Sequence, residues 1–214
     1  MSPTKKVKSA KLNKRFPAIA LIELDSIAIG VLAGDAMAKK APLAMLKTGT
    51  IHPGKYLVMV GGEVAAVEES YREGLRIAGS AMVDNVILPD VHQQVLDGIF
   101  GTKLPNRQEA LGVMETSTVA ANIDSADAAI KGASVTILEM RLADGLGGRS
   151  FTLFGGKVED VQAAIQIGTE RVRGRNIEIH TTVVPRVDEG MAAAIDLASR
   201  FFNKTGDDPK DLDG

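Results

Sequence analysis

The stretch that decides the fold is Ala20-Leu21-Ile22-Glu23-Leu24-Asp25-Ser26-Ile27-Ala28, which returns as Gly112-Val113-Met114-Glu115-Thr116-Ser117-Thr118-Val119-Ala120. Glu23 and Glu115 hold the same place in the two copies, 92 positions apart. The offset is 94 at Gly62 and Gly156, so the second copy carries a two-residue insertion before that point. A repeat of this length is a duplicated domain, because the units of solenoid proteins are only about 20 to 50 residues long.

Apolar runs and periodicity predict the elements of each copy. In the first copy we expect strands at 18–24, 43–50, 55–61 and 85–88, and helices at 26–40, 62–78 and 91–99. In the second copy we expect strands at 110–115, 135–142, 149–154 and 177–184, and helices at 119–131, 158–172 and 188–202. Each copy is then a ferredoxin-like β-α-β-β-α-β unit, an α+β arrangement within the broad α/β class, whose helices cover one face of an antiparallel sheet.

These elements divide the chain into a first domain at 17–103 and a second at 107–203, each large enough for a modest core. Residues 1–16 carry five lysines and one arginine without any acid, and residues 204–214 are acidic overall. Neither end has an apolar period, so both are predicted to be flexible tails. For the basic tail, a solvated extension is favoured over binding to nucleic acid or to an acidic partner.

Composition excludes several classes of function. The chain has no cysteine, which rules out disulfides, thiol catalysis and thiolate-bound metals. It has no run of about 18 apolar residues, so no membrane span is expected, and its basic start lacks the apolar segment of a signal peptide. Aromatic residues amount to 4%, too few for the stacking surfaces of nucleic-acid binders. No catalytic constellation of serine, histidine and acid is found, so an enzyme is not expected.

Eight short motifs follow one another across the two copies. The first copy contains Ile22-Glu23-Leu24-Asp25-Ser26-Ile27-Ala28, Asp35-Ala36-Met37-Ala38-Lys39, Ile51-His52-Pro53-Gly54-Lys55-Tyr56 and Val60-Gly61-Gly62-Glu63-Val64. The second contains Val113-Met114-Glu115-Thr116, Asp127-Ala128-Ala129-Ile130-Lys131-Gly132, Gly145-Leu146-Gly147-Gly148-Arg149 and Val184-Pro185-Arg186. With these motifs the chain resembles the shell proteins of bacterial microcompartments, in particular the tandem-domain trimeric class typified by the propanediol-utilisation trimer.

This resemblance implies a flat tile in which three chains place six domains around a central pore, and tiles that join edge to edge in a shell around enzymes. The partners it implies are two further copies of the chain and other shell proteins, in the bacterial cytoplasm, with no membrane and no nucleic acid. By motif position it puts Lys39, Lys131 and Arg186 at the tile edge. The first copy has Asp90 where the second has Arg186, so only half of the edges would keep that arginine.

The resemblance also places two loops at the pore, which are Ile51-His52-Pro53-Gly54 and Gly145-Leu146-Gly147-Gly148. In the propanediol-type trimer a cysteine stands in the place of His52, and three such cysteines hold an iron–sulfur cluster. Because this chain has no thiolate to offer, the cluster is not expected here. Glycine suits the second loop, since backbones approach one another near a symmetry axis and a Cβ would collide there.

Three interpretations of His52 stay open. Three imidazoles that converge on a threefold axis match an open site for one divalent metal. They also suit a pore lining that gains positive charge as the pH falls through about 6.5. The simplest interpretation is a polar turn residue that only narrows the opening. No other cofactor is expected.

Three functions compete at this point. The first is a structural shell tile with a pore for small polar metabolites. The second is a shell subunit that carries a metal or electrons through His52 at the trimer axis. The third is a regulator that binds a small molecule, because ferredoxin-like repeats also serve as sensors and a fold does not fix a function.

Overall fold

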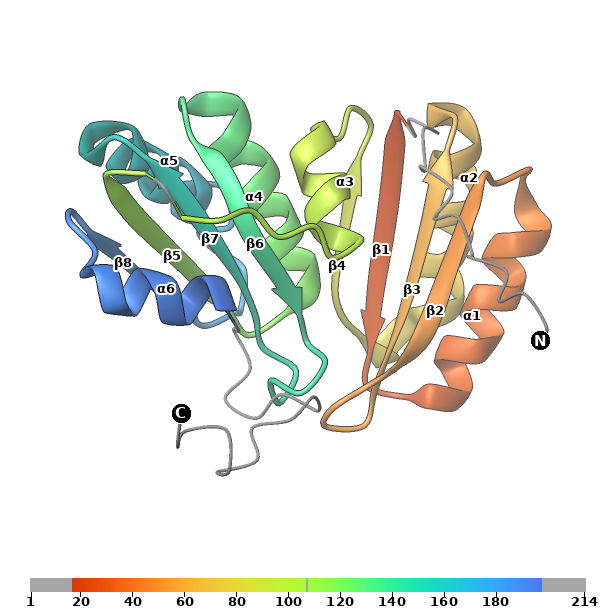
Figure 1. Ribbon diagram of the computed structural model, residues 1–214. Helices are drawn as coiled ribbons and strands as arrows, with labels where there is room; N and C mark the ends of the chain where they lie inside the picture. The colour runs from red at the N-terminus through yellow and green to blue at the C-terminus, as the bar shows by residue number, and fades with distance from the viewer. Residues whose placement is uncertain (1–16, 107, 198–214) are drawn as a thin grey trace, which may run out of the picture.

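The computed structural model describes residues 17–106 and 108–197, which form two similar domains (Figure 1). The first comprises β1 (Ala18–Leu24), α1 (Ile27–Lys40), β2 (Met45–Ile51), β3 (Lys55–Gly62), α2 (Val64–Ala78), β4 (Met82–Leu88) and α3 (Gln93–Ile99). The second comprises β5 (Ala110–Thr116), α4 (Val119–Gly132), β6 (Thr136–Leu142), β7 (Ser150–Gly156), α5 (Val158–Arg171), β8 (Ile179–Val184) and α6 (Glu189–Leu197). The predicted fold class is confirmed. The predicted tails at 1–16 and 204–214, and the stretch 198–203, lie outside the described residues.

In the first domain four antiparallel strands lie in the order β2-β3-β1-β4, and α1 and α2 cover one face of the sheet (Figure 1). β1 is the central apolar strand, and all seven of its residues are buried. Ser26 starts α1, because its hydroxyl accepts the backbone N–H of Ile29 at 3.3 Å. The two helices pack closely at Gly74, where a Cβ would lie 2.5 Å from the sulfur of Met37.

The second domain repeats this arrangement with the strand order β6-β7-β5-β8. α4 and α5 cover the face of its sheet that carries Met114 and Phe154. The two-residue insertion predicted from the repeat lies in the β6–β7 loop. Five residues separate Ala143 from Arg149, whereas three separate the equivalent Ile51 from Lys55.

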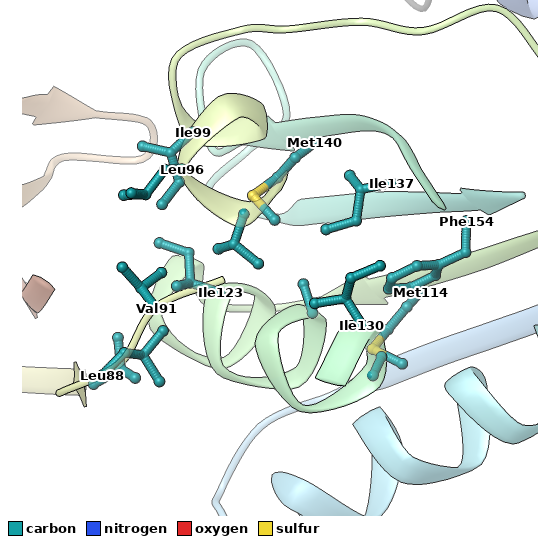
Figure 2. Packing of buried hydrophobic residues seen from close by; sticks show 14 of the residues in the cluster. Leu88, Val91, Leu96, Ile99, Met114, Ile123, Ile130, Ile137, Met140 and Phe154 are labelled. Carbon is teal, nitrogen blue, oxygen red and sulfur yellow. The ribbon is translucent and has the colours of Figure 1, made fainter. Parts of the chain in front are cut away.

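The two domains share one hydrophobic core. α4 packs against β4 and β1 of the first domain as well as against its own sheet. Figure 2 shows Leu88, Val91, Leu96 and Ile99 of the first domain close to Ile123 of α4. Because α4 lies between two sheets, eleven of its fourteen residues are buried, against four of fourteen in α1.

β4 is the strand whose predicted extent differs most from the structure. The apolar pattern predicts residues 85–88, but the strand begins at Met82. Its first half contains Asp84 and Asn85, whose polar groups bind Arg175 of the second domain. Among the residues that the structure describes, no helix has both the length and the hydropathy that crossing a bilayer requires.

Candidate functional site

Two hairpin loops lie side by side at one end of the molecule (Figure 1). The β2–β3 loop is closed by the N–H of Gly54, which donates to the carbonyl of Ile51 at 3.0 Å. The longer β6–β7 loop is closed by the N–H of Ala143, which donates to the carbonyl of Arg149 at 3.0 Å. The loops touch at Gly148, where a Cβ would lie 2.8 Å from the carbonyl oxygen of His52. Gly148 also has φ = +84°, so glycine is required there for space and for conformation.

The residues predicted to line the pore all belong to these two loops. Exposed among them are His52, Pro53, Gly54, Gly145 and Gly147. Ile51 and Leu146 are half-buried, and Gly148 is buried against the first loop. The structure therefore brings the two predicted pore loops together at one end of the molecule. That they line a pore stays a prediction, because a pore on a threefold axis needs three chains.

A metal site at His52 is likewise not complete within one chain. In residues 17–106 and 108–197, no group of three or more histidine and carboxylate side chains lies close enough to hold a metal ion. His52 is exposed on its loop, so each chain offers one imidazole at this place. A metal at His52 would need imidazoles from three copies, and it stays a prediction.

Glu23 connects the two domains, a role that the sequence did not reveal. Its carboxylate is fully buried and accepts from the ammonium of Lys55 and from the backbone N–H of Val119, both at 2.8 Å. Val119 is the first residue of α4, so Glu23 satisfies a free N–H at the start of a helix in the other domain. Burial raises the pKa of Glu23, while the hydrogen bonds from Lys55 and Val119 oppose that rise.

A cluster of charged side chains lies beside Glu23 at the same boundary. Asp124 of α4 has a side chain only 1% exposed, and it pairs with Arg171 at 2.8 Å and with Arg175. Arg175 also reaches Asp84 of β4 at 3.4 Å. The second carboxylate oxygen of Asp84 accepts the hydroxyl of Thr118 at 2.6 Å. No motif announces this cluster, since its members lie up to 91 residues apart.

The far end of α4 makes two more contacts with the first domain. Asp127 accepts the backbone N–H of His92 at 2.8 Å. Lys131 donates to the carbonyl oxygen of Asp90 and pairs with Asp127 at 2.7 Å. Together with Glu23 these contacts define the inner seam, by which we mean the boundary between α4 and the first domain.

The three predicted tile-edge residues have different surroundings. The side chain of Lys131 lies at the inner seam and is still 39% exposed. The side chain of Lys39, the equivalent residue of α1, is 73% exposed and pairs with Asp35 at 2.6 Å. Arg186 is exposed beyond the end of β8. A role at a tile edge stays a prediction for all three.

In the first domain, one face of the sheet is covered by the second domain. Among the described residues, the equivalent face of the second sheet is not covered by another domain. The face forms an apolar groove of about 840 Å³ between its strands and α6. The groove is lined by Leu111, Val113, Phe151, Leu153 and Val184, among others. Their equivalents in the first domain are Ile19, Leu21, Leu57, Met59 and Leu88, which belong to or pack against the core that the two domains share.

α1 is exposed in the same way. Ile27, Val31 and Leu32 are large apolar residues on its surface and are 44%, 54% and 53% exposed. Val119 and Ile123, which occupy the positions of Ile27 and Val31 in α4, are fully buried at the inner seam. Within the described residues, α1 thus presents an uncovered apolar surface on one side of the molecule, and the second domain presents an uncovered apolar groove on the other. We call these two surfaces together the outer seam.

The two copies match a known protein family. The BMC domain family matches residues 18–91 and 110–187, which are the two copies. The bacterial microcompartment shell protein PduT of Citrobacter freundii is 40% identical over 174 residues, which are 81% of this chain and 95% of that protein. The carboxysome assembly protein CcmO of Synechocystis is 25% identical over 91% of this chain and 70% of that protein.

Solved structures agree with these matches. A microcompartment protein from Desulfitobacterium hafniense has a TM-score of 0.71 and 37% identity, over 82% of this chain and 98% of that one. A fused, permuted hexameric shell protein of the RMM microcompartment has a TM-score of 0.53 and 22% identity, over 72% of this chain and 83% of that one. The second likeness concerns the fold alone.

Proposed function

The chain belongs to the BMC-domain family of bacterial microcompartment shell proteins, and on that premise we propose that three copies form a pseudohexagonal tile with a central opening for small polar metabolites. Its function is structural, as a subunit of a microcompartment shell. The observation that carries the trimer is the outer seam, because its two halves repeat the two halves of the inner seam.

The side chains that make the polar contacts of the inner seam also have equivalents at the outer seam. Three of its hydrogen bonds end on backbone atoms, namely those of Val119, His92 and Asp90. The equivalent side chains Glu115, Asp35 and Lys39 are all present in the sequence. In the proposed trimer they bind the backbone of Ile27, Asp188 and Arg186 across the outer seam. A contact that repeats head to tail generates a ring if its rotation closes, and six domains in one ring require three chains.

The mass in solution tests the trimer. We expect light scattering to give three times the chain mass of 22.6 kDa. Leu32→Asp copies Asp124 into α1, where the positions of Arg171 and Arg175 hold no arginine, and should reduce the assembly to single chains. Ala65→Glu, at an exposed position of α2, is the matched control and should leave the mass unchanged. A single-chain mass for the unaltered protein would contradict the proposal, because such interfaces are large and obligate.

In this trimer three His52 loops alternate with three glycine-rich loops around the axis. This arrangement is supported by the contact between the two loops within one chain, because each copy then contributes one loop of each kind side by side. His52→Ala should preserve the trimer and widen the opening, measured as faster passage of small solutes through assembled shells. Metal analysis of the unaltered protein tests the three-histidine site, and a stoichiometric metal that His52→Ala removes would support it. If neither permeability nor metal content changes, His52 is only a turn residue.

The edge residues are tested by sheet formation. Lys39→Ala, Lys131→Ala and Arg186→Ala should weaken lateral association of tiles, seen by electron microscopy as fewer or smaller hexagonal sheets. Light scattering must first show that each variant is still a trimer, because Lys131 contacts Asp90 at the inner seam and the proposed trimer has Lys39 bind the backbone of Arg186 across the outer seam. If intact trimers of these variants form unchanged sheets, the three side chains make no contact between tiles and are only solvent-exposed.

A further inference from the structure

A pocket of about 260 Å³ lies between the domains, on the face of the first sheet that meets the second domain. Its lining is mainly aliphatic, with Leu21, Leu57 and Met59 from the first sheet. Ile99 of α3, Val119 of α4 and Leu142 of β6 complete the wall. The pocket therefore belongs to a single chain, and its existence does not depend on the proposed trimer.

The pocket is open because β2 has a glycine at its centre. A Cβ built on Gly49 would meet no atom within 4 Å, so the space in front of it is free. The equivalent residue of β6 is Arg141, whose guanidinium lies over the ring of Phe151 at 5.7 Å. The second domain therefore fills the corresponding place with its own side chain. The free space in front of Gly49 therefore has no counterpart at Arg141.

The two ends of the pocket differ in charge. Lys47 and Ile51 lie on the same face of β2, four residues apart, which separates the two ends by roughly 13 Å. The ammonium of Lys47 lies 5.9 Å from the centre of the Phe100 ring, and no carboxylate among the described residues forms an ion pair with it. Asp144, at the loop end, already interacts with another group. The free charge at this pocket is therefore a cation.

We propose that this pocket binds a small aliphatic carboxylate, with its hydrocarbon part on the aliphatic wall and its carboxylate at Lys47. The wall favours the hydrocarbon because it removes apolar surface from water. The carboxylate gains a charge-assisted hydrogen bond from an ammonium that has no acidic partner in the described chain. Val119, the residue whose N–H binds Glu23, lines the same pocket, so the ligand would contact the inner seam directly.

Calorimetric titration of the full chain with hexanoate tests this site, with hexanol and hexylamine as matched probes. We expect hexanoate to bind more tightly than either probe. Lys47→Met should weaken hexanoate binding about 10-fold, the loss of one charge-assisted contact, and leave hexanol within about 2-fold. Gly49→Leu should abolish binding of both, because its side chain occupies the free space. Lys157→Met, at an exposed lysine far along the sequence, is the control for loss of charge and should bind as the unaltered protein does.

Three results would overturn the proposal. The first is absence of hexanoate binding to the unaltered protein. The second is binding that survives Gly49→Leu while the variant keeps the circular dichroism spectrum and mass of the parent. The third is a preference for hexylamine over hexanoate, which would assign the polar end to Asp144. None of these results depends on whether the protein forms trimers.

Discussion

α1 and α4 occupy the same place in the two domains, yet one is a surface helix and the other lies between two sheets. Four residues of α1 are buried, against eleven of α4. The sequences have diverged accordingly, since α4 carries Asp124 where α1 carries the exposed Leu32. The comparison teaches that the inner seam combines apolar packing with buried ion pairs, whereas α1 presents apolar side chains without the equivalent of Asp124.

The sharpest test of this comparison places one charge at equivalent positions of the two helices. Ile123→Glu buries an unpaired carboxylate in the shared core and should lower the free energy of unfolding by more than about 4 kcal/mol. Val31→Glu lies on an exposed position and should leave the helical circular dichroism intact while abolishing association. Urea unfolding and light scattering measure the two effects. Equal loss of structure in both variants would contradict the distinction between the seams.

The ion cluster of the inner seam gives the next largest effect. Arg175→Ala removes the cation that Asp124 and Asp84 share, and should cost about 3 kcal/mol in urea unfolding. Arg171 still pairs with Asp124, which keeps the loss from being larger. Arg173→Ala is the control, because its side chain is 74% exposed and its pairing distance to Glu170 is 3.9 Å. It should cost less than about 0.5 kcal/mol. Equal costs for the two arginines would mean that the cluster does not hold the domains together.

Glu23 gives the smallest effect, a dependence of stability on pH. Burial raises the folded pKa of Glu23 above its ordinary value of 4.5, so the folded protein binds this proton more tightly than the unfolded chain. The protonated Glu23 therefore stabilises the fold fully below pH 4.5, and this stabilisation is lost as the pH rises through the folded pKa. Relative to Glu23→Gln, the unaltered protein should therefore lose stability as the pH rises from 4.5 into the neutral range.

Urea midpoints across that range measure the difference. Glu69→Gln removes an exposed carboxylate of α2 and provides the baseline for losing one charge. A difference between Glu23→Gln and the unaltered protein that stays constant with pH, or that has the opposite slope, would contradict the burial argument.

The sequence predicted the fold well because the fold is encoded locally. β1 is an apolar run, Ser26 is a helix cap, and the duplication shows every element twice. The two-residue insertion was also found in the repeat and lies in the β6–β7 loop. β4 was predicted too short, because Asp84 breaks the apolar pattern and its carboxylate is paired by Thr118 and Arg175 of the second domain, 34 and 91 residues later.

The candidate site was only partly visible in the sequence. Proline and glycine mark the turn at His52, and the resemblance to shell proteins places this loop and the loop at Gly145 together at a pore, which stays a prediction. Their contact at Gly148, and the bond from Val119 to Glu23, depend on how the domains stack, which no local pattern describes. Glu23 and Glu115 were visible as a repeated pair. Only the structure distinguishes the buried carboxylate from the exposed one.

The unequal lengths of the two hairpin loops have a consequence for how such an opening evolves. In a ring of six identical domains, every substitution at the axis appears six times, so its charge and its width change together. Here His52 stands on the short loop and the inserted residues on the long one, so in the proposed trimer each substitution appears three times. In the proposed trimer, gene duplication therefore separates the charge of the opening from its width, and selection can act on the histidine loop without changing the glycine loop beside it.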